Sequence, residues 1–559
     1  MSTALHRLRW IAPVAVLALA ALLRLWALGR PDSLVFDELY YVRDAVSQLA
    51  HGFTTTWPDD DPAFGGERAT LFSDQPNAIA HPPLGKWLIA LGILLLGPDS
   101  GWGWRIAAAL AGVATVGLTM RLGWLMSRSM WIACLAGLLL AVDGVHVVLS
   151  RVSLLDGFLT LFVVLGALFV WRDQASPRDF LRRGALGRIA WRRPWLIAAG
   201  IAFGAAAAVK WSGLYALAGF LVLITLRDWW LRRRERRAGL LRRPLAGAAV
   251  QALATAAIAL PAAFATYLAS WAGWIANPGA QERTTGEAWW TSLARWHADA
   301  LNWHSSLSAP HPYQANPLSW PLALRPTAMY EASWGAEQGC RWASGCVSAI
   351  SPLPNPLVTW GGVLALALLV WVVLRSGWIA ARRGARSVAG ARPSPAGRAF
   401  RAPAFWAAAF VLTGYLSGWL PWVLTFSRSA VFQFYAVVLT PFAALALALV
   451  LGALACVPPP VAPRSARDGS RMGVSGTLHP PFATHSAGGE RPGTAAPSVL
   501  ALAGIRPDPS PAAVRGRRLA VAVFVIAALV LGVLFFPVWS GMPIAEWFWR
   551  AHLWLPGWR

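Results

Sequence analysis

Long uncharged apolar runs alternate with short polar segments along this chain. The runs from Trp10 to Leu28, Trp131 to Val142 and Leu519 to Phe536 contain almost no ionisable group. A helix of about 20 apolar residues spans the hydrocarbon core of a bilayer. A spanning segment must be helical because lipid offers no partner to its backbone polar groups. The pattern therefore predicts an all-α integral membrane protein.

The apolar runs and the arginines between them predict about eleven membrane spans. They cover roughly residues 10–29, 104–122, 130–149, 154–171, 195–209, 212–226, 245–268, 356–375, 403–425, 430–455 and 519–537. The run from Leu84 to Leu96 is too short to span comfortably, and we expect it to form a helix on the outer membrane surface. The first run is interpreted as a retained helix, because no small-residue cleavage pattern follows it.

The distribution of arginine predicts which loops face the cytoplasm. Four loops carry seven, eight, seven and eight arginines, namely 172–194, 227–243, 375–401 and 456–518. The positive-inside rule places all four in the cytoplasm, and it places the two long arginine-poor loops outside. This topology accounts for the net charge of +24. Nucleic acid, the usual partner of so basic a soluble protein, is therefore not expected.

We expect three parts in the chain. Residues 1–270 would form a catalytic transmembrane module whose first extracytoplasmic loop, 30–103, bears surface helices. Residues 271–355 would form a second large extracytoplasmic loop, and residues 356–559 a C-terminal module of four transmembrane helices. The cytoplasmic loop 456–518 is rich in Pro, Gly, Ala, Ser and Arg, so it is predicted to be disordered. The Trp-rich tail after Phe536 is expected to lie along the outer surface.

Two adjacent acids, Asp37 and Glu38, directly follow the first predicted span. A carboxylate at a membrane surface can deprotonate a hydroxyl nucleophile as a general base. The alternative is a solvated helix start, where acidic residues are stabilised by the helix dipole. The dipeptide alone leaves both interpretations open.

Lysine is rare in this chain: only Lys86 and Lys210 accompany 47 arginines. Both lysines fall on the outer face in the predicted topology, against the positive-inside trend. A compact ammonium group is a good point contact for a phosphate, and Lys86 follows His81 in a segment that opens the predicted surface helix. The alternative is a lysine whose stem covers apolar surface while its charge reaches water.

Arg105, Arg151 and Asp156 flank predicted spans on the same face. Ionisable groups at such positions are either interface anchors or site residues, and Arg151 could form a structural ion pair with Asp156. Acids and cations together suit transfer from a lipid phosphate. The cations would hold the leaving phosphate while a carboxylate deprotonates the acceptor.

The second outer loop offers further candidates. Its segment from Trp303 to Trp320 includes His304, His311 and Tyr313 and is dense in aromatic and hydrogen-bonding groups, which suits sugars and peptides. The histidines could bind a metal, but a packed, hydrogen-bonded loop is the favoured interpretation, and the need for a divalent metal stays open. Cys340 and Cys346 could form a disulfide if this loop is outside.

The ordered series of these segments resembles the protein O-mannosyltransferase family. The series comprises Asp37-Glu38, His81 to Lys86, Arg105, Ser150 to Asp156 and Val209 to Leu214. His311 to Trp320, the segment Trp419-Leu420-Pro421-Trp422 and the Trp-rich tail resemble the actinobacterial branch. Taken by itself, the segment Trp419 to Trp422 with Arg428 could also be only an aromatic belt at the membrane interface. The loop before Asn355-Pro356-Leu357 departs from that branch, so a sugar-binding role there is in doubt. The resemblance covers nearly the whole chain except loop 456–518.

The resemblance implies a GT-C glycosyltransferase in the cell membrane, with a polyprenyl-phosphate-mannose donor and an extracytoplasmic active site. The acceptor would be Ser or Thr of a secreted protein, glycosylated with inversion during or after export, so the export translocon could be a partner. Asp37 would be the catalytic base and Glu38 would support it. Lys86 and Arg105 would lead the donor-phosphate contacts, together with Lys210 and Arg151. Asp156, His81, His311, Tyr313 and Arg428 would support the site.

Two other functions stay open. A related lipid-linked transferase would use a lipid or glycan acceptor and would share the same first loop. A polytopic transporter would instead place its ionisable groups near the membrane midplane on broken helices. The gathering of such groups at one face favours an interfacial enzyme.

Overall fold

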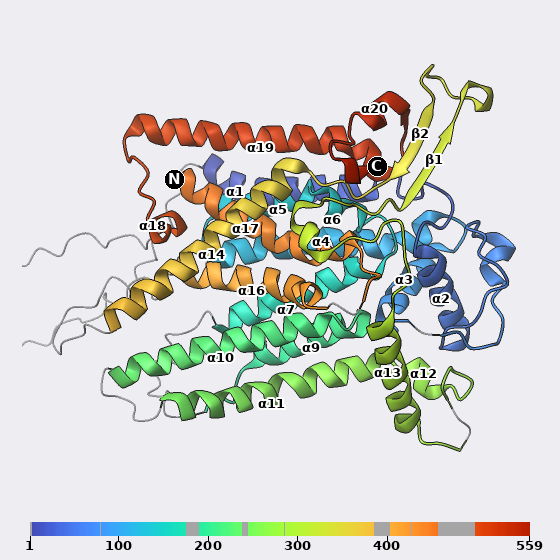
Figure 1. Ribbon diagram of the computed structural model, residues 1–559, viewed down its shortest axis with the longest axis horizontal. Helices are drawn as coiled ribbons and strands as arrows, with labels where there is room; N and C mark the ends of the chain where they lie inside the picture. Colours follow the sequence, from blue (N-terminus) through green and yellow to red (C-terminus); the bar gives the residue numbers. More distant parts are fainter. Residues whose placement is uncertain are drawn as a thin grey trace, which may run out of the picture.

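The computed structural model describes residues 3–78, 80–174, 189–237, 244–283, 286–384, 403–425, 428–456 and 498–559. Within these ranges, long helices lie side by side along the longest axis of the molecule, and shorter elements gather at one end (Figure 1). Seven helical segments of the described residues are long and apolar enough to cross a membrane. The molecule therefore has the form of a transmembrane bundle with an elaborated end.

Each predicted span contains an α-helix within the described residues. The helices are α1 (Thr3–Leu25), α4 (Gly101–Ser127), α5 (Met130–Ala141), α7 (Leu155–Gln174), α9 (Pro194–Val209), α10 (Gly213–Arg237), α11 (Pro244–Ser270), α14 (Pro356–Gly384), α16 (Pro403–Val423), α17 (Thr440–Leu454) and α19 (Pro511–Ser540). The apolar helices within α1, α5 and α9 are shorter than 18 residues. Predicted span 130–149 is interrupted, because Asp143 accepts the backbone N–H of His146 at 2.9 Å and starts the separate helix α6 (Gly144–Val148).

Small residues allow the closest helix contact next to the site. A Cβ added at Gly200 or Gly204 of α9 would lie 2.5 and 2.4 Å from the carbonyl oxygens of Ala259 and Ala263 of α11. Backbones approach this closely only where side chains are absent, as in the small-residue interfaces of membrane helices. The alanine-rich sequence of α9 thus fixes the place of its last residue, Val209, from which Lys210 follows.

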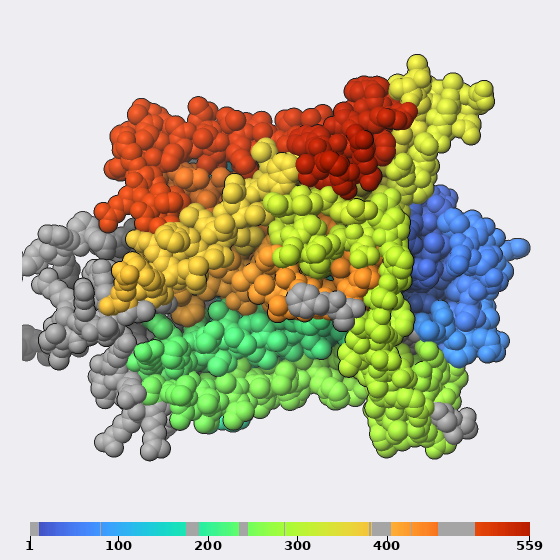
Figure 2. Space-filling model, in the orientation of Figure 1, coloured from blue at the N-terminus to red at the C-terminus, as the bar shows by residue number. Residues whose placement is uncertain are grey.

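The elaborated end is built from the two long loops and the chain terminus. It contains α2 (Glu38–His51), η1 (Gly66–Thr70), α3 (Leu84–Leu96), α12 (Ala272–Ala276), α13 (Trp289–Ser306), η3 (Pro317–Leu322), β1 (Tyr330–Trp334), η4 (Ala336–Gln338), β2 (Cys346–Ile350), β3 (Pro543–Ala545), α20 (Glu546–Arg550) and η6 (Pro556–Trp558). Helix α3 has the bounds predicted for the short apolar helix. Helix α13 lies across the ends of α10 and α11, and its atoms form part of a ridge beside the first loop (Figures 1 and 2).

A small antiparallel sheet, which the apolar pattern does not predict, joins the second loop to the tail. Its order is β1-β2-β3, with Cys346 paired to Trp334 on one side and to Ala545 on the other. The Trp-rich tail is only partly superficial: Trp547 and Trp554 are exposed, whereas Trp539 and Trp558 are buried. The tail is thus part of the core as well as of the surface.

The structure differs from the prediction of disorder over 456–518 at the end of that loop. Residues 498–518 are ordered: α18 (Val499–Ala503) packs against α14 and α17, and α19 begins at Pro511. Arg375 of α14 donates to the carbonyl of Leu502 at 2.8 Å, which satisfies the C-terminal end of the short helix. Residues 457–497 lie outside the described part of the chain.

Candidate functional site

A cavity of about 220 Å³ opens at the elaborated end of the bundle. One part of its wall is polar or aromatic and comes from His81, Asp156, Lys210, Trp211, Ser212, Tyr215, His304, Ser305, Trp422, Thr425, Arg428 and Tyr435. The other part is apolar or small and comes from Leu159, Val163, Ala216, Leu301, Gly414, Gly418 and Val438. The cavity therefore has a charged part and an apolar part, the latter lined from α7, α10, α13, α16 and the 3-10 helix η5 (Gln433–Leu439).

Asp37 stands at the start of α2, where it is only partly exposed. Burial raises the pKa of its carboxyl to about 6, the charge of Asp156 adds to that rise, and Lys210 and a hydrogen bond from Tyr41 oppose it. The carboxyl is therefore mostly ionised at neutral pH, yet it is a stronger base than an ordinary aspartate. Asp37 is thus the one of the two predicted catalytic acids that could accept a proton from a substrate.

Glu38 is fully buried and is committed to structural contacts. Its two carboxylate oxygens accept from Arg105 at 2.8 and 2.7 Å. The same oxygens accept the backbone N–H groups of Ser153 at 2.8 Å and Val35 at 3.0 Å. Glu38 thus holds the start of α2 against α4 and the turn before α7. It can position Asp37, but it has no access to a substrate.

Arg105 does not fit its predicted role in donor-phosphate binding, because every N–H of its guanidinium is already used. It is fully buried in α4. Besides Glu38 it donates to the carbonyls of Leu28 at 3.3 Å, Pro31 at 2.8 Å and Ser33 at 2.8 Å. A guanidinium has five donors in a fixed fork, and these contacts account for all five. Arg105 is a structural pin for the segment that leads from the first span to Asp37.

Arg151 is likewise occupied by backbone groups. It is buried and donates to the carbonyls of Leu23, Arg24 and Trp26 at 3.1, 3.2 and 2.8 Å, and to that of Ala27 at 3.4 Å. These carbonyls lie at the C-terminal end of α1, where a cation also complements the helix dipole. Arg151 therefore anchors the end of α1 and does not line the cavity. Its predicted phosphate contact is corrected for this reason.

Lys86 is not among the residues that line the cavity. Its Nζ lies 2.9 Å from Oδ2 of Asp44, and only 1% of its side chain is exposed. This ion pair ties α3 to α2. Because this enclosed ammonium does not line the cavity, we assign the leading phosphate contact expected from the sequence a structural role instead.

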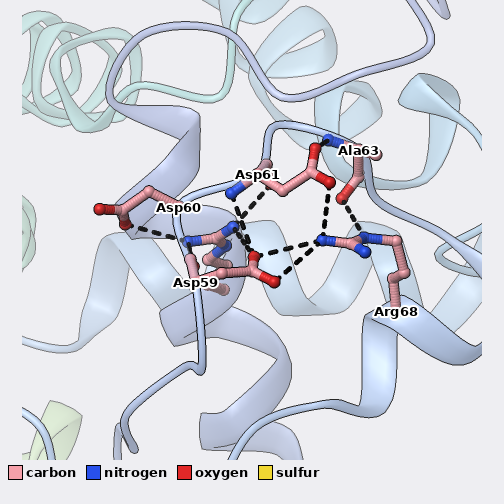
Figure 3. Close-up of polar contacts among 6 residues, drawn as sticks. Asp59, Asp60, Asp61, Ala63 and Arg68 are labelled. Atoms are coloured by element: carbon pink, nitrogen blue, oxygen red, sulfur yellow. Dashed lines mark hydrogen bonds and ion pairs between the residues drawn. The ribbon is translucent and has the colours of Figure 1, made fainter.

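Arg43, next to Asp44 on α2, holds the loop that follows this helix. It donates to the carbonyls of Asp59 and Asp61, each at 2.7 Å. Arg68 joins the same loop through the carboxylates of Asp59 and Asp61 at 3.2 and 3.0 Å (Figure 3). Buried or bidentate arginine contacts of this kind fix backbone geometry. Helix α2 is thus fastened at its start by Glu38, and along its length by Arg43 and Asp44.

Lys210 and Asp156 do meet in the cavity. Lys210 follows the end of α9, Asp156 lies in the first turn of α7, and Nζ donates to Oδ2 at 2.7 Å. The ammonium also lies 4.8 Å from the ring centre of Tyr435 and 5.8 Å from that of Phe434. Asp156 pairs with Lys210 and not with Arg151, the partner that the sequence suggested. Because an ammonium has three N–H donors, Lys210 keeps capacity for a ligand.

Arg428 enters the same cavity from the segment before α17. Its Nε donates to the carbonyl of Ala430 at 3.0 Å, and one terminal nitrogen lies 3.0 Å from Nδ1 of His304. Nε2 of His304 lies 2.7 Å from the carbonyl of Ala80, and burial lowers the pKa of this histidine. The neutral ring therefore donates to Ala80 and accepts from Arg428. Among the described residues, Arg428 has no carboxylate within 4.0 Å.

The histidines of the predicted site make aromatic and hydrogen-bonding contacts. His81 lines the cavity and stacks on His304, with ring centres 5.3 Å apart. His311 is exposed outside the cavity lining, and its Nδ1 accepts the backbone N–H of Tyr313 at 3.1 Å. In the ranges that the structure describes, no three His, Cys, Asp or Glu side chains are arranged to hold a metal. Cys340 and Cys346 form a disulfide in the hairpin.

Sequence reasoning did not single out the aromatic support behind Lys210. Trp211 lines the cavity and donates from Nε1 to the hydroxyl of Tyr267 at 3.0 Å. Tyr267 in turn lies 2.7 Å from Nε2 of His297 on α13, whose Nδ1 lies 2.7 Å from the carbonyl of Leu293. This chain of hydrogen bonds connects the cavity wall to α13. The signal in the sequence was the motif around Lys210, but its partners are more than 50 residues away.

Comparison with known proteins gives consistent matches over both halves of the chain. The model of the family described as dolichyl-phosphate-mannose-protein mannosyltransferase matches residues 14–277. The model of the C-terminal four TMM region of protein-O-mannosyltransferase matches residues 289–558. The chain is 31% identical to the polyprenol-phosphate-mannose–protein mannosyltransferase of Mycobacterium tuberculosis, over 99% of this chain and 93% of that protein. It is 30% identical to the protein of the same name from Mycolicibacterium smegmatis, over 98% and 93%.

The fold also matches a solved structure. A chain of the Saccharomyces cerevisiae protein O-mannosyltransferase Pmt1-Pmt2 complex bound to the sugar donor superposes with a TM-score of 0.66. The match covers 98% of this chain and 92% of that chain, at 14% sequence identity. At this identity the likeness concerns the arrangement of the helices and not individual side chains.

Proposed function

The chain belongs to the polyprenol-phosphate-mannose–protein mannosyltransferase family and is a GT-C glycosyltransferase, and on that premise we propose a mechanism for its cavity. In this proposal the chain transfers mannose from polyprenyl-phosphate-mannose to Ser and Thr hydroxyls of exported proteins. The transfer proceeds with inversion at the outer face of the membrane. The observation that carries the mechanism is a cavity wall with two cations, Lys210 and Arg428, beside an acid, Asp37, whose pKa responds to the charges of Lys210 and Asp156.

The donor phosphate is assigned to the cationic part of the cavity, between Lys210 and Arg428. Lys210 retains donors beyond the one given to Asp156, and Arg428 is not neutralised by a carboxylate among the described residues. Charge that develops on the leaving phosphate would be stabilised by these fixed donors in a partly water-excluded site. His81 and His304 form the adjoining neutral wall.

The polyprenyl chain is assigned to the apolar part of the cavity. Leu159 and Val163 of α7 lie opposite Gly414 and Gly418 of α16, and all four line the cavity. The two glycines let Phe442, Leu439 and Val438 pack closely against α16, and the apolar side chains of the lining offer a surface to a lipid tail. An isoprenoid tail would thus leave the headgroup site toward the lipid while the phosphate stays at the membrane surface.

Asp37 is assigned as the general base. The acceptor oxygen attacks the anomeric carbon of mannose as its proton passes to the Asp37 carboxylate. The bond between that carbon and the phosphate oxygen breaks, and polyprenyl phosphate leaves with the electron pair. A single in-line displacement inverts the configuration at the sugar carbon. Glu38 supports the reaction by fixing the turn that carries Asp37, through its contacts with Arg105 and Ser153.

The proposed orientation is supported by the opposite ends of the helices that reach the cavity. Helix α7 reaches it with Asp156 and carries Arg172 in its last turn. Helix α9 reaches it with Lys210 and starts after Arg193. Because arginine favours the cytoplasmic side, the cavity end would be extracytoplasmic. An acceptor emerging from the export translocon would meet this face before it folds.

The decisive assay is transfer of radiolabelled mannose from polyprenyl-phosphate-mannose to a Ser/Thr peptide by the purified, reconstituted chain. Label in the peptide supports the proposal. Label only in a lipid or glycan fraction would assign the chain to a different acceptor class. Release of free mannose alone would contradict a transferase role for this site.

Orientation has its own test. Ser305 is exposed at the mouth of the cavity, and the free Cys456 is exposed near the end of α17. A membrane-impermeant maleimide should label Ser305→Cys in intact cells and should reach Cys456 only after permeabilisation. The reverse pattern would place the cavity in the cytoplasm.

A further inference from the structure

The residue before Asp37 has a backbone conformation that its side chain does not favour. Phe36 has φ +49°, in the left-handed region. It occupies the first central position of a turn in which the N–H of Glu38 donates to the carbonyl of Val35 at 2.9 Å. A positive φ at this position of a turn favours glycine. A bulky residue persists there only if its surroundings hold it, and such outliers cluster at functional sites.

Three aromatic side chains from distant parts of the chain hold the Phe36 ring. Its centre lies 6.3 Å from that of His311, 6.4 Å from Phe432 and 5.6 Å from Phe434, all edge to face. We name these three residues the aromatic clamp. Its members also contact one another: His311 lies 4.9 Å from Phe432, and Phe432 stacks on Phe434 at 5.6 Å. Edge-to-face pairs are favourable beyond the area that they bury, and three of them together offset the strain of one residue.

The clamp also contacts the other side of the proposed reaction centre. The ring of Phe434 that receives Phe36 lies 5.8 Å from Nζ of Lys210. Asp37 follows Phe36 directly, and its other neighbour, Glu38, is fixed by Arg105. Asp37 therefore lies between an ion-paired residue, Glu38, and a residue held by aromatic contacts, Phe36. The Phe434 ring that contacts Phe36 also lies near the Lys210 ammonium.

We propose that Phe36, held by His311, Phe432 and Phe434, is a positioning residue that sets the place of the Asp37 carboxylate relative to Lys210. The inference rests on the proposed function, in which Asp37 takes the acceptor proton and Lys210 contacts the phosphate. It also gives His311 a role outside the cavity: His311 shapes the turn that presents the base and does not touch the sugar. Through this packing, the C-terminal half of the chain reaches a base that belongs to the N-terminal half.

The test separates the ring from the backbone. Phe36→Ala removes the clamp contact and keeps the backbone penalty, whereas Phe36→Gly removes both, because glycine adopts positive φ freely. If the ring positions the base, both variants lower kcat by about tenfold to a hundredfold with the donor KM within about twofold, since a small misplacement of a reacting group costs that much. Phe36→Tyr, which keeps the ring, retains most activity. Full activity in Phe36→Gly would show that only the backbone matters and would overturn the proposal.

A matched control distinguishes positioning from loss of stability. Phe64 lies in the same outer loop and packs edge to face on Trp104 at 5.4 Å, away from Asp37. Phe64→Ala should lower the melting temperature without moving the pH midpoint of kcat. Phe36→Ala should move that midpoint, because the pKa of Asp37 depends on its burial and its distance from Lys210. An equal kcat loss with an unmoved midpoint in both variants would contradict the proposal.

A double variant tests the clamp from its other side. Phe432→Ala removes one of the three rings that hold Phe36, so it should lower kcat by less than Phe36→Ala does. The double variant should be little worse than Phe36→Ala alone, since that variant already lacks the contact. Additive losses would exclude the clamp. These ratios refer to the wild-type rate on whichever acceptor takes the label. The clamp can therefore be tested even if the acceptor proves not to be a Ser or Thr hydroxyl.

Discussion

Lys210 donates to Asp156 over 2.7 Å, and this pair joins the end of α9 to the first turn of α7 at the wall of the cavity. The pair places a cation where a lipid phosphate would lie, and it also places a second carboxylate near Asp37. The proposed base therefore works in a field of one cation and one additional anion. Whether each of these groups is free to bind a ligand or is already bound within the protein determines how its removal should change the reaction.

Asp37→Asn should abolish transfer while leaving insertion and donor binding unchanged. Asparagine is nearly the same size but cannot take a proton from the acceptor hydroxyl. A loss of at least about a hundredfold in kcat is expected, since general base catalysis contributes about that much or more. The measurement is mannose transfer at saturating donor, with donor binding and thermal stability as controls. Activity near the wild-type level would remove Asp37 from the mechanism.

The rate should depend on pH through the same carboxyl. The base must be ionised, and burial raises its pKa to about 6, so kcat should fall as the pH drops through about 6 and level off above it. A folded-state pKa above the ordinary value also means that ionised Asp37 opposes folding at neutral pH, by an amount that disappears as the pH falls. A kcat profile flat from about pH 5 to about pH 8 would contradict this assignment.

Arg428→Ala should mainly weaken binding of the mannose donor. Its guanidinium lines the cavity and, among the described residues, pairs with no carboxylate, so its removal takes a phosphate contact away without stranding a buried anion. We expect the donor KM to rise about tenfold, the scale of one charge-assisted hydrogen bond. Arg325→Ala, which removes an exposed arginine that donates to the carbonyl of Pro312, is the matched control. An unchanged donor KM and kcat in the Arg428 variant would exclude this contact.

Lys86→Met should destabilise the protein and affect the donor only indirectly. The change leaves Asp44 buried without its partner, which typically costs about 3–5 kcal/mol. A lower melting temperature in detergent is expected, with an unchanged donor KM in the folded fraction. Adding Asp44→Asn to the variant should restore part of the stability, because the stranded charge is removed. A raised donor KM without loss of stability would return Lys86 to the phosphate site.

Arg43→Ala should loosen the loop that packs on α2. The variant loses the donors to the carbonyls of Asp59 and Asp61, each at 2.7 Å. We expect faster proteolysis within residues 52–80 and a decrease in stability of about 2–3 kcal/mol, the range for hydrogen bonds from a charged group. Limited proteolysis of the reconstituted protein, compared with Arg68→Ala at the exposed side of the same loop, measures this. Equal protection in the Arg43 variant and the wild type would contradict the role.

The apolar pattern was sufficient to predict the helices. Length and hydropathy identify a spanning segment because lipid offers no hydrogen-bond partners, so the backbone N–H and C=O groups must bond to one another within the helix. The bounds of helix α3 were predicted correctly, since Pro83 precedes its first residue and Gly97 follows its last. The pattern did not reveal the three-stranded sheet, because each strand is short and β3 lies almost 200 residues after its partner β2. It also missed α18, a five-residue helix that exists only through its packing on α14 and α17.

The order of spans and polar segments along the chain is enough to show which ionisable residues gather at one end of the bundle, because each stands at a set place relative to a span. That order does not reveal their partners. From the sequence, Lys86 and Arg105 led the expected phosphate contacts and Arg428 was only a supporting residue. In the fold, Arg105 and Arg151 are occupied by Glu38 and by backbone carbonyls, and Lys86 pairs with Asp44 outside the cavity lining. Lys210 and Arg428 line the cavity. This distinction arises in the folded molecule alone, because the availability of a charge depends on which groups, distant along the chain, pack within hydrogen-bonding distance of it.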